Sequence, residues 1–168
     1  GLAKKHKSMY SEYAPTIYAL TAAIDAKDHY TFQHSKNVAY YAEAIARAIG
    51  TSDEYREILK EAALLHDIGK LGVPRALLEK EGPLDHDEFA QMKRHAEFSL
   101  SLLDNIPGLE DIRLWGALHH ERLNGRGYPL GLAGGQLPLP SRIMAVADIF
   151  TALMEDRPYR KGMSLARA

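Results

Sequence analysis

The sequence predicts an all-α protein, a compact helical bundle with one long loop rich in glycine and proline. Three observations support this fold class. Apolar residues recur at helical spacing along most of the chain. Alternating patterns typical of strands are scarce, and glycine and proline are concentrated in residues 124–140. A chain of 168 residues has the length of one domain with a substantial core.

The first two helices are expected at residues 9–26 and 31–49. Each has an apolar face whose side chains recur every three or four residues. On the first helix this face holds Tyr13, Ile17, Leu20 and Ile24. On the second helix it holds Val38, Tyr41, Ile45 and Ile49. His34 falls on the second of these faces, and Gly50 favours the end of that helix.

The third helix is expected to begin near Ser52 or Asp53 and to stop around Gly69, with His66 and Asp67 in its last turn. One side of this helix carries apolar residues at helical spacing, namely Ile58, Ala62 and Leu65. Pro74 then opens a short segment.

A further helix should begin at Asp85, because Glu88 three residues later completes a capping box. Phe89, Met92 and Ala96 define its inner face, and His95 lies on or beside that face. If Phe89 is fully buried, its replacement by alanine should cost about 3–5 kcal/mol of stability.

Two more helices are expected at residues 109–120 and 141–154. The first places Ile112, Trp115 and His119 on one side. The second is apolar over residues 143–150 except for Asp148. The residues between these helices form the long loop, and ordered loops of this length are often functional.

Composition excludes several classes of function. The chain has no cysteine, so it has no disulfide framework, no thiolate metal ligand and no cysteine nucleophile. The formal net charge of -1 lacks the basic footprint of a protein that binds duplex nucleic acid. No apolar run reaches the roughly 18 residues of a membrane span, and no signal peptide opens the chain. We therefore expect a cytoplasmic protein.

The positions of the histidines point to a shared polar pocket. A carboxylate such as Asp148 in an apolar helix needs a partner, which could be a core arginine, Arg142 or Arg113, or a metal ion. A single inward histidine is usually a satisfied core residue. Here, however, the pairs His66-Asp67 and His119-His120 each fall at a predicted helix end, where adjacent side chains can reach one site.

Five histidines and two aspartates suffice to bind two divalent metal ions. Imidazole and carboxylate ligands suit Fe, Mn, Zn, Ni or Co and do not select one of them. One carboxylate, most simply that of Asp67, could bridge the two ions. Two ions about 3.5–4 Å apart polarise a phosphoryl group and activate a bridging hydroxide that attacks it. Such a site needs no serine or cysteine nucleophile.

These residues resemble a known family. His66-Asp67, with upstream His34 and downstream Asp148, is similar to the HD superfamily of metal-dependent phosphohydrolases. The segment from His119-His120-Glu121 through Gly125-Arg126-Gly127-Tyr128-Pro129 resembles the HD-GYP subgroup. The resemblance covers about residues 28–160. It implies a helical bundle of the HD-domain type around a metal centre, and hydrolysis of cyclic di-GMP to linear pGpG or GMP.

The resemblance also implies roles for single residues. The implied metal ligands are His34, His66, Asp67, His95, His119, His120 and Asp148. Asp67 and Lys70 are the implied catalytic residues, and Lys70 would also contact the phosphate. Arg157 and Arg160 correspond to positions that hold the nucleotide, and both could instead be surface residues. Tyr128 and Pro129 should shape the loop, while Gly125 and Gly127 should adopt positive φ or approach another segment closely.

Two departures from the family pattern bear on the site. Tyr30 stands where members with three metals carry a glutamate, so we expect two metals. Thr151 stands where many members carry an aspartate among the substrate-binding residues, which leaves one guanine contact and the base preference open. We expect residues 1–27 to form a helix that connects to an upstream sensor or receiver domain and pairs in a homodimer. We expect residues 28–168 to form the catalytic domain, and we expect it to be truncated at its C-terminus relative to the family.

Four functions remain to be compared. The first is a cyclic di-GMP phosphodiesterase, and the second uses the same chemistry on another cyclic dinucleotide. The third is a non-catalytic sensor or interaction module for such a nucleotide, for which a lost metal ligand would be the expected mark. The fourth is an HD-type nucleotidase acting on mononucleotides, which the GYP segment disfavours.

Overall fold

The computed structural model describes residues 2–28, 31–156 and 161–168, with backbone only for residues 2–12, 25, 31 and 32. Its described part is helical, as predicted, and its only extended pairing is an isolated bridge between Asn124 and Ala133. The α-helices are α1 (Leu2–Lys27), α2 (Thr31–Ala48), α3 (Asp53–Leu65), α4 (Arg75–Leu78), α5 (His86–Leu103), α6 (Glu110–Ala117) and α7 (Leu139–Met154). Two 3-10 helices are η1 (Ile68–Gly72) and η2 (Gly134–Gln136).

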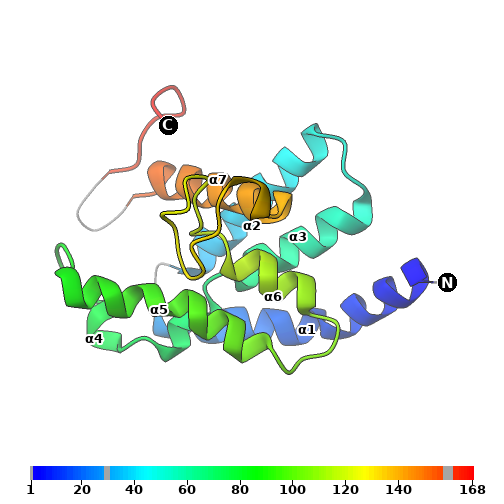
Figure 1. Cartoon of the computed structure of the whole chain (residues 1–168), viewed down its shortest axis with the longest axis horizontal. Helices are drawn as coiled ribbons and strands as arrows, with labels where there is room; N and C mark the ends of the chain where they lie inside the picture. The colour runs from blue at the N-terminus through cyan, green and yellow to red at the C-terminus, as the bar shows by residue number, and fades with distance from the viewer. Residues whose placement is uncertain (1, 29–30, 157–160) are drawn as a thin grey trace.

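Helix α3 is the central element of the bundle. It packs against α1, α2 and α6, while α7 covers the other side of α2 and α5 covers η1 (Figure 1). Its start follows the prediction, since the Ser52 side chain accepts a hydrogen bond from the Tyr55 amide at 3.2 Å. The capping box at the start of α5 is also confirmed, with Asp85 and Glu88 bonding each other's backbone amides.

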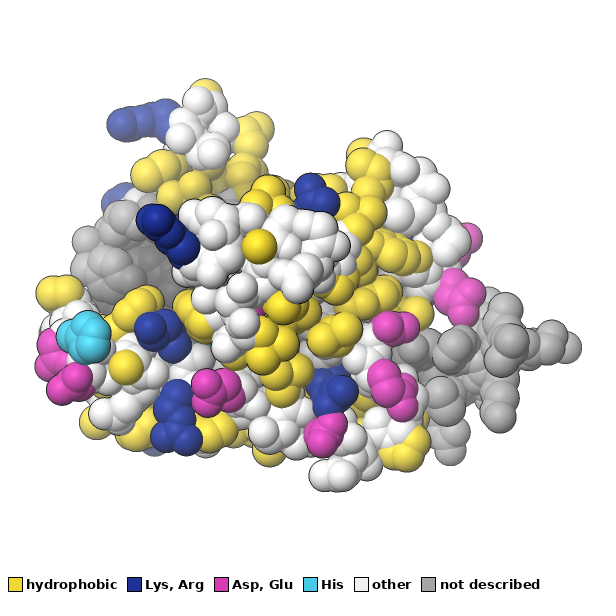
Figure 2. Space-filling model, in the orientation of Figure 1, with side chains coloured by type: hydrophobic (Ala, Val, Ile, Leu, Met, Phe, Trp, Pro, Cys, Tyr) yellow, Lys and Arg dark blue, Asp and Glu magenta, His cyan; other side chains and the backbone are white. Residues whose placement is uncertain are grey.

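The core is formed by the inner faces of these helices. Its largest fully buried apolar side chains are Ile17, Ile24, Val38, Leu59, Leu65, Ile68, Val73, Ile112, Leu118 and Met144. The predicted faces of the first three helices therefore largely point inward. Apolar side chains also remain on the surface, as Figure 2 shows, which is normal for a domain of this size.

Two residues predicted for the core are on the surface. Phe89 is 49% exposed and Ile49 is 53% exposed, so both predictions are wrong. The close contacts that cover α5 fall in its second half, where Gly69 meets the backbone of His95 and Gly72 meets Phe98. Phe89 lies in the first turns of α5, before those contacts begin. Ile49 follows the last residue of α2 and leaves the packed face with the turn.

The His66–Asp67 pair lies in a break between two helices rather than in the last turn of one. Helix α3 ends at Leu65, and Asp67 has φ -99° and ψ 11° before η1 begins. Gly69 allows this junction to pack on α5, because a Cβ atom there would lie 1.8 Å from the His95 carbonyl oxygen. Helix α6 likewise ends at Ala117, so His119 and His120 lie in the following turn.

The long loop between α6 and α7 is compact. Gly125 has φ +70°, and a Cβ atom on Gly127 would lie 2.4 Å from the Cα atom of Glu121. Both glycine predictions are thus confirmed, one by positive φ and the other by close approach. Across the described residues, no helix combines the length and the apolar character needed to cross a membrane.

Candidate metal centre

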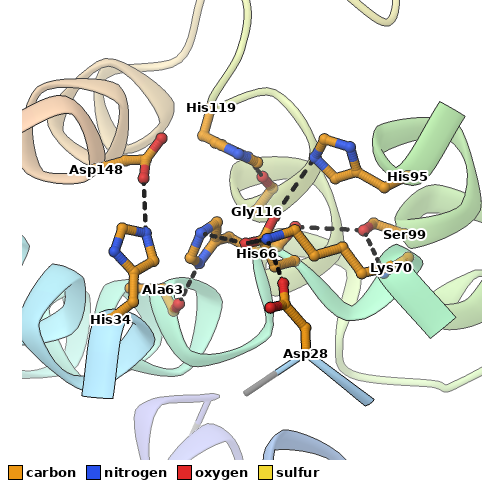
Figure 3. A network of polar contacts seen from close by, with 12 residues as sticks. Asp28, His34, Ala63, His66, Lys70, His95, Ser99, Gly116, His119 and Asp148 are labelled. Carbon is orange, nitrogen blue, oxygen red and sulfur yellow. Dashed lines mark hydrogen bonds and ion pairs between the residues drawn. The ribbon is translucent and has the colours of Figure 1, made fainter. Parts of the chain in front are cut away.

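Side chains from five parts of the chain converge on one polar cavity of about 280 Å³. These five parts, which carry the predicted metal ligands, are α2, the α3–η1 junction, α5, the turn after α6, and α7, as Figure 3 shows for several of them. The lining residues are Asp28, His34, His66, Asp67, Lys70, Met92, His95, His119, His120, Tyr128, Asp148 and Ala152. The seven residues predicted as metal ligands are all in this set.

The seven residues fall into two groups that could each hold a metal ion. One group is Asp67, His95, His119 and His120, and the other is His34, His66 and Asp148. Within each group the possible ligand atoms lie within 4.8 Å of one another. Asp67 connects the groups, because its Oδ1 lies 3.4 Å from His95 Nε2 and its Oδ2 lies 3.3 Å from His66 Nε2.

Backbone carbonyls orient three of the histidines. The Nδ1–H groups of His66, His95 and His119 donate to the carbonyls of Ala63, Met92 and Gly116 at 2.6–2.7 Å. A carbonyl can only accept, so Nδ1 carries a proton in each of the three rings and Nε2 is the ring nitrogen left for a metal ion, once it is unprotonated. The Nε2 atoms of His95 and His119 are buried and have no hydrogen-bond partner among the described residues.

Such an arrangement fits metal coordination. Metal-bound histidines typically donate their second ring N–H to a carbonyl or carboxylate, which sets the tautomer and the ring orientation. A buried ring nitrogen without a partner is otherwise costly. The residues present therefore fit a pair of divalent cations.

Among the described residues, Asp148 pairs with His34 and with no arginine. Its Oδ1 lies 2.9 Å from His34 Nε2, and His34 Nδ1 lies 2.9 Å from an oxygen of Glu155. Arg113 pairs with Asp104, and Arg142 is exposed. The alternative of a core arginine partner for Asp148 is thus wrong.

Burial keeps three of the histidines neutral. It lowers the pKa of His95, and together with the nearby His120 it lowers the pKa of His119 well below its usual range. Burial, with a contribution from His95, also lowers the pKa of His120 to about 4. A neutral imidazole is the form that binds a metal, so these three side chains are ready to coordinate at neutral pH.

Opposite charges outweigh burial at three other groups. Burial lowers the pKa of His66, but Asp67 raises it to a net value of about 9. Burial raises the pKa of Asp67, but Lys70 and His66 hold it well below its usual range. For Asp148, burial is outweighed by the hydrogen bond from His34, which lowers the pKa. The carboxylates are therefore ionised, and a cation bound here would replace the proton on His66.

Lys70 lies on the wall of the cavity in a charged network. Its Nζ atom lies 2.9 Å from Asp67. It also lies 3.1 Å from Asp28, as Figure 3 shows. Burial lowers the pKa of Lys70, but these two carboxylates raise it above its usual range, so the ammonium group stays charged. A phosphate group in the cavity would meet this charge.

Of the other residues predicted to contribute to the site, some line the cavity and others do not. Tyr128 lines the cavity, and its ring lies 4.7 Å from that of His120. Thr151 is 1% exposed in α7 and does not line the cavity, so no contact with a substrate follows from its position. Arg157, Arg160 and Tyr30 lie outside the described residues.

Three residues that position the site have no role assigned from the sequence. Asp28 pairs with Lys70, and Glu155 pairs with His34. Glu121 is 5% exposed and accepts hydrogen bonds from the amides of three consecutive loop residues, Leu130, Gly131 and Leu132. The only feature of the sequence that indicated a role for Glu121 is its position directly after His119-His120. Asp28 and Glu155 carry no local pattern that distinguishes them from surface acids.

Comparisons with known proteins agree with this geometry. The model of the HD domain family matches residues 19–168. The chain is 41% identical over 167 residues to a 3'3'-cGAMP-specific phosphodiesterase of Vibrio cholerae, covering 99% of this chain and 36% of that protein. It is 38% identical over 155 residues to a cyclic di-GMP phosphodiesterase response regulator of Xanthomonas campestris, covering 91% and 41%. The chain thus spans less than half the length of these curated relatives.

A solved structure has the same fold. An HDG"Y"P protein from Bdellovibrio bacteriovorus aligns with a TM-score of 0.66 at 18% identity, over 90% of this chain and 53% of that chain. The predicted all-α fold and the predicted family resemblance are both confirmed by these comparisons.

Proposed function

This chain belongs to the HD domain family, and from that premise we propose that it is a metal-dependent phosphodiesterase that hydrolyses a cyclic dinucleotide. One observation carries the proposal. Asp67 directs its two carboxylate oxygens toward histidines of two different candidate metal groups. A carboxylate placed between two sites could hold two cations close together, and two cations about 3.5–4 Å apart can promote phosphoryl hydrolysis. We assign His34, His66, Asp67, His95, His119, His120 and Asp148 as the ligands.

When bound, a pair of divalent cations would polarise the phosphodiester and lower the pKa of a water molecule. The chain's own residues then have separate tasks. The Nδ1–carbonyl hydrogen bonds hold the ligand rings in one orientation before a cation arrives. Lys70 supplies a fixed positive charge for the phosphate oxygens. Burial and the nearby Asp67 raise the pKa of Tyr128, so its hydroxyl stays protonated and can donate a hydrogen bond to the same group.

We propose two metals per chain, with Fe or Mn as the expected ions. The donor set of imidazole and carboxylate also accepts Zn, Ni or Co. The choice of two rather than three rests on the seven ligands and on Tyr30, which replaces the glutamate expected of a third site.

The proposed substrate is cyclic di-GMP, cleaved to pGpG or GMP. Another cyclic dinucleotide is the second candidate, because one relative is named for 3'3'-cGAMP and another for cyclic di-GMP at similar identity. A non-catalytic sensor is the third candidate. The complete ligand set disfavours it, because a protein that only binds nucleotide has no need for seven converging ligands.

A single experiment compares these functions. Anaerobically purified protein is loaded with Fe or Mn, its metal content is measured, and products from cyclic di-GMP and 3'3'-cGAMP are identified by chromatography. We expect two metal equivalents and a linear dinucleotide or mononucleotide. Nucleotide bound but intact after hours at full metal loading would refute the phosphodiesterase and establish the sensor.

Two histidine variants provide the control. His119→Ala removes a buried ligand whose Nε2 faces the cavity, and it should lower metal content and activity together. His86→Ala removes a histidine whose side chain is 98% exposed at the start of α5, so it should retain both. If the two variants had the same metal content and the same activity, the assignment of His119 as a ligand would be contradicted.

The organisation of the longer protein is also a proposal. One relative is named a response regulator, which supports an upstream receiver or sensor domain here. We propose that residues 1–27 connect to it and pair in a homodimer, and that residues 28–168 carry the catalysis. The second half of α1 also contributes to the core, since Ile17 and Ile24 are buried and the Thr21 hydroxyl, which donates to the Ile17 carbonyl, lies 3.5 Å from the Leu64 carbonyl oxygen.

A further inference from the structure

The cavity is too small for the whole of the proposed substrate. Its volume is about 280 Å³, whereas pockets that enclose a drug-sized ligand have about 300–1,000 Å³. Most of its lining is histidine, aspartate or lysine, which suits a phosphodiester rather than a purine ring. A substrate with two purine nucleosides must therefore extend over the rim of the cavity.

Helix α5 forms one part of that rim. Met92 and His95 line the cavity, and Phe89 lies one turn before Met92, about 5 Å along the helix axis. The side chain of Phe89 is 49% exposed, although it belongs to a residue type that is usually buried. Lysine and arginine side chains lie over this part of α5 in Figure 2.

Lys93 joins the exposed ring to the cavity. Its Nζ atom lies 5.1 Å from the centre of the Phe89 ring and 6.0 Å from the centre of the Tyr128 ring, which lines the cavity. No carboxylate of a described residue forms an ion pair with Lys93, whereas Lys80 near the start of the same helix pairs with Glu88. The rim thus combines a half-exposed aromatic ring with an ammonium group that has no ion-pair partner among the described residues.

We propose that Phe89 and Lys93 form a guanine-binding subsite at the rim of the cavity. This subsite rests on the proposed function, since it receives a base of the same cyclic dinucleotide whose phosphodiester enters the cavity. The purine stacks on the exposed Phe89 ring, as bases stack on aromatic side chains in single-stranded nucleic-acid sites. The Lys93 ammonium donates to the base edge.

The base preference follows from hydrogen-bond chemistry. Guanine presents two acceptors, O6 and N7, on the edge that a lysine can reach. Adenine presents N7 and an amino group on that edge, and the amino group is a donor that cannot bond to an ammonium. Stacking on Phe89 contributes equally to the binding of both bases, so Phe89 raises the affinity without distinguishing them. Lys93 provides the preference for guanine.

Binding measurements separate these two roles. Metal-loaded protein is titrated by calorimetry with phosphorothioate analogues of cyclic di-GMP and cyclic di-AMP, which resist hydrolysis. Lys93→Met keeps the aliphatic stem but removes the donors, so it should weaken cyclic di-GMP binding by about tenfold more than cyclic di-AMP binding. Phe89→Leu should weaken binding of both nucleotides to the same extent, by about tenfold.

The same helix provides a matched control. Arg94 lies over the Phe98 ring at 4.9 Å, another pair of a cation and an aromatic ring four residues apart, and neither residue lines the cavity. Arg94→Met should leave both affinities unchanged. The proposal is overturned if Lys93→Met reduces both affinities equally, or if neither Lys93→Met nor Phe89→Leu differs from Arg94→Met.

Hydrolysis of unmodified cyclic di-GMP by the same wild-type sample reports the proposed function separately. If that hydrolysis fails while Lys93→Met still abolishes the preference for guanine, the subsite stands and the phosphodiesterase proposal is refuted. If hydrolysis succeeds while the affinity ratio is unchanged in Lys93→Met, the subsite is refuted and the phosphodiesterase proposal stands.

Discussion

Replacing Glu121 by alanine should release the loop between α6 and α7 while the helical bundle stays folded. The carboxylate accepts three backbone hydrogen bonds, from Leu130 at 2.6 Å and Gly131 at 3.0 Å on one oxygen, and from Leu132 at 2.9 Å on the other. These contacts join the turn that carries His120 to the part of the loop that follows Tyr128. None of them involves a helix of the core, so their loss should be local.

The size of the effect follows from the number and exposure of these bonds. A hydrogen bond to a charged acceptor contributes about 1.5–3 kcal/mol. The three bonds share one carboxylate, so their contributions to the stability of the loop do not add in full. Leu130 is 57% exposed, so its freed amide can bond to water, which reduces the loss. We expect about 3 kcal/mol for local opening, or about 100-fold in the opening equilibrium.

Amide hydrogen exchange resolved by residue measures this opening. The amides of residues 130–132 should exchange about 100-fold faster in Glu121→Ala, whereas those of α3 should not change. Glu121→Gln keeps one oxygen that can accept from Leu130 and Gly131, so its effect should be intermediate. Glu79→Ala is the matched control, since Glu79 pairs with Arg75 on the exposed surface of α4 and contributes at most about 1 kcal/mol. Unchanged protection at residues 130–132 in Glu121→Ala would refute this reasoning.

Three further outcomes are expected. Asp67→Ala should lose both metal equivalents together with hydrolysis, and two equivalents retained in metal analysis would contradict its bridging role. Phe89→Ala should change the free energy of unfolding by less than about 1 kcal/mol in urea denaturation, whereas Leu59→Ala, at a site with no exposed surface, should cost about 2–5 kcal/mol. Burial raises the pKa of Glu61 from 4.5 to about 7, so ionising it opposes folding. Glu61→Gln should therefore raise the Tm at about pH 8 and have little effect at about pH 4, and a larger effect at the lower pH would reverse the assignment.

The sequence allowed the helices to be predicted because their signals are local. Apolar periodicity located α2 and α5, and the capping residues Ser52 and Asp85 placed two helix starts. The same periodicity could not tell where a neighbouring element stops. Phe89 lies on the helix face that also carries buried Ala96, yet the elements that cover α5 do not extend to it. The exposure of Phe89 depends on tertiary packing, which the local sequence does not reveal.

The candidate ligands were predictable for a related reason. Each is a polar residue at an inward position or at a helix end, where burial without a partner is costly. Their division into two groups was not predictable, because it depends on which oxygen of Asp67 faces His66 and which faces His95. The role of Glu121 escaped prediction as well, because its partners are backbone amides, and these look alike in every sequence.

Charge balance explains how the fold accommodates these residues. Asp67 is 4% exposed, and an isolated carboxylate at that depth would cost far more than the marginal stability of a domain of this size allows. Lys70 and His66 supply positive charge within 3.3 Å of it, and Lys70 also contacts Asp28. The lysine therefore does two things from one position: it allows the Asp67 carboxylate to be buried, and it places a fixed positive charge on the wall of the cavity. Lys70→Met should accordingly reduce folding stability and phosphodiester binding together, while a variant that weakened only one of the two would show that the roles are separable.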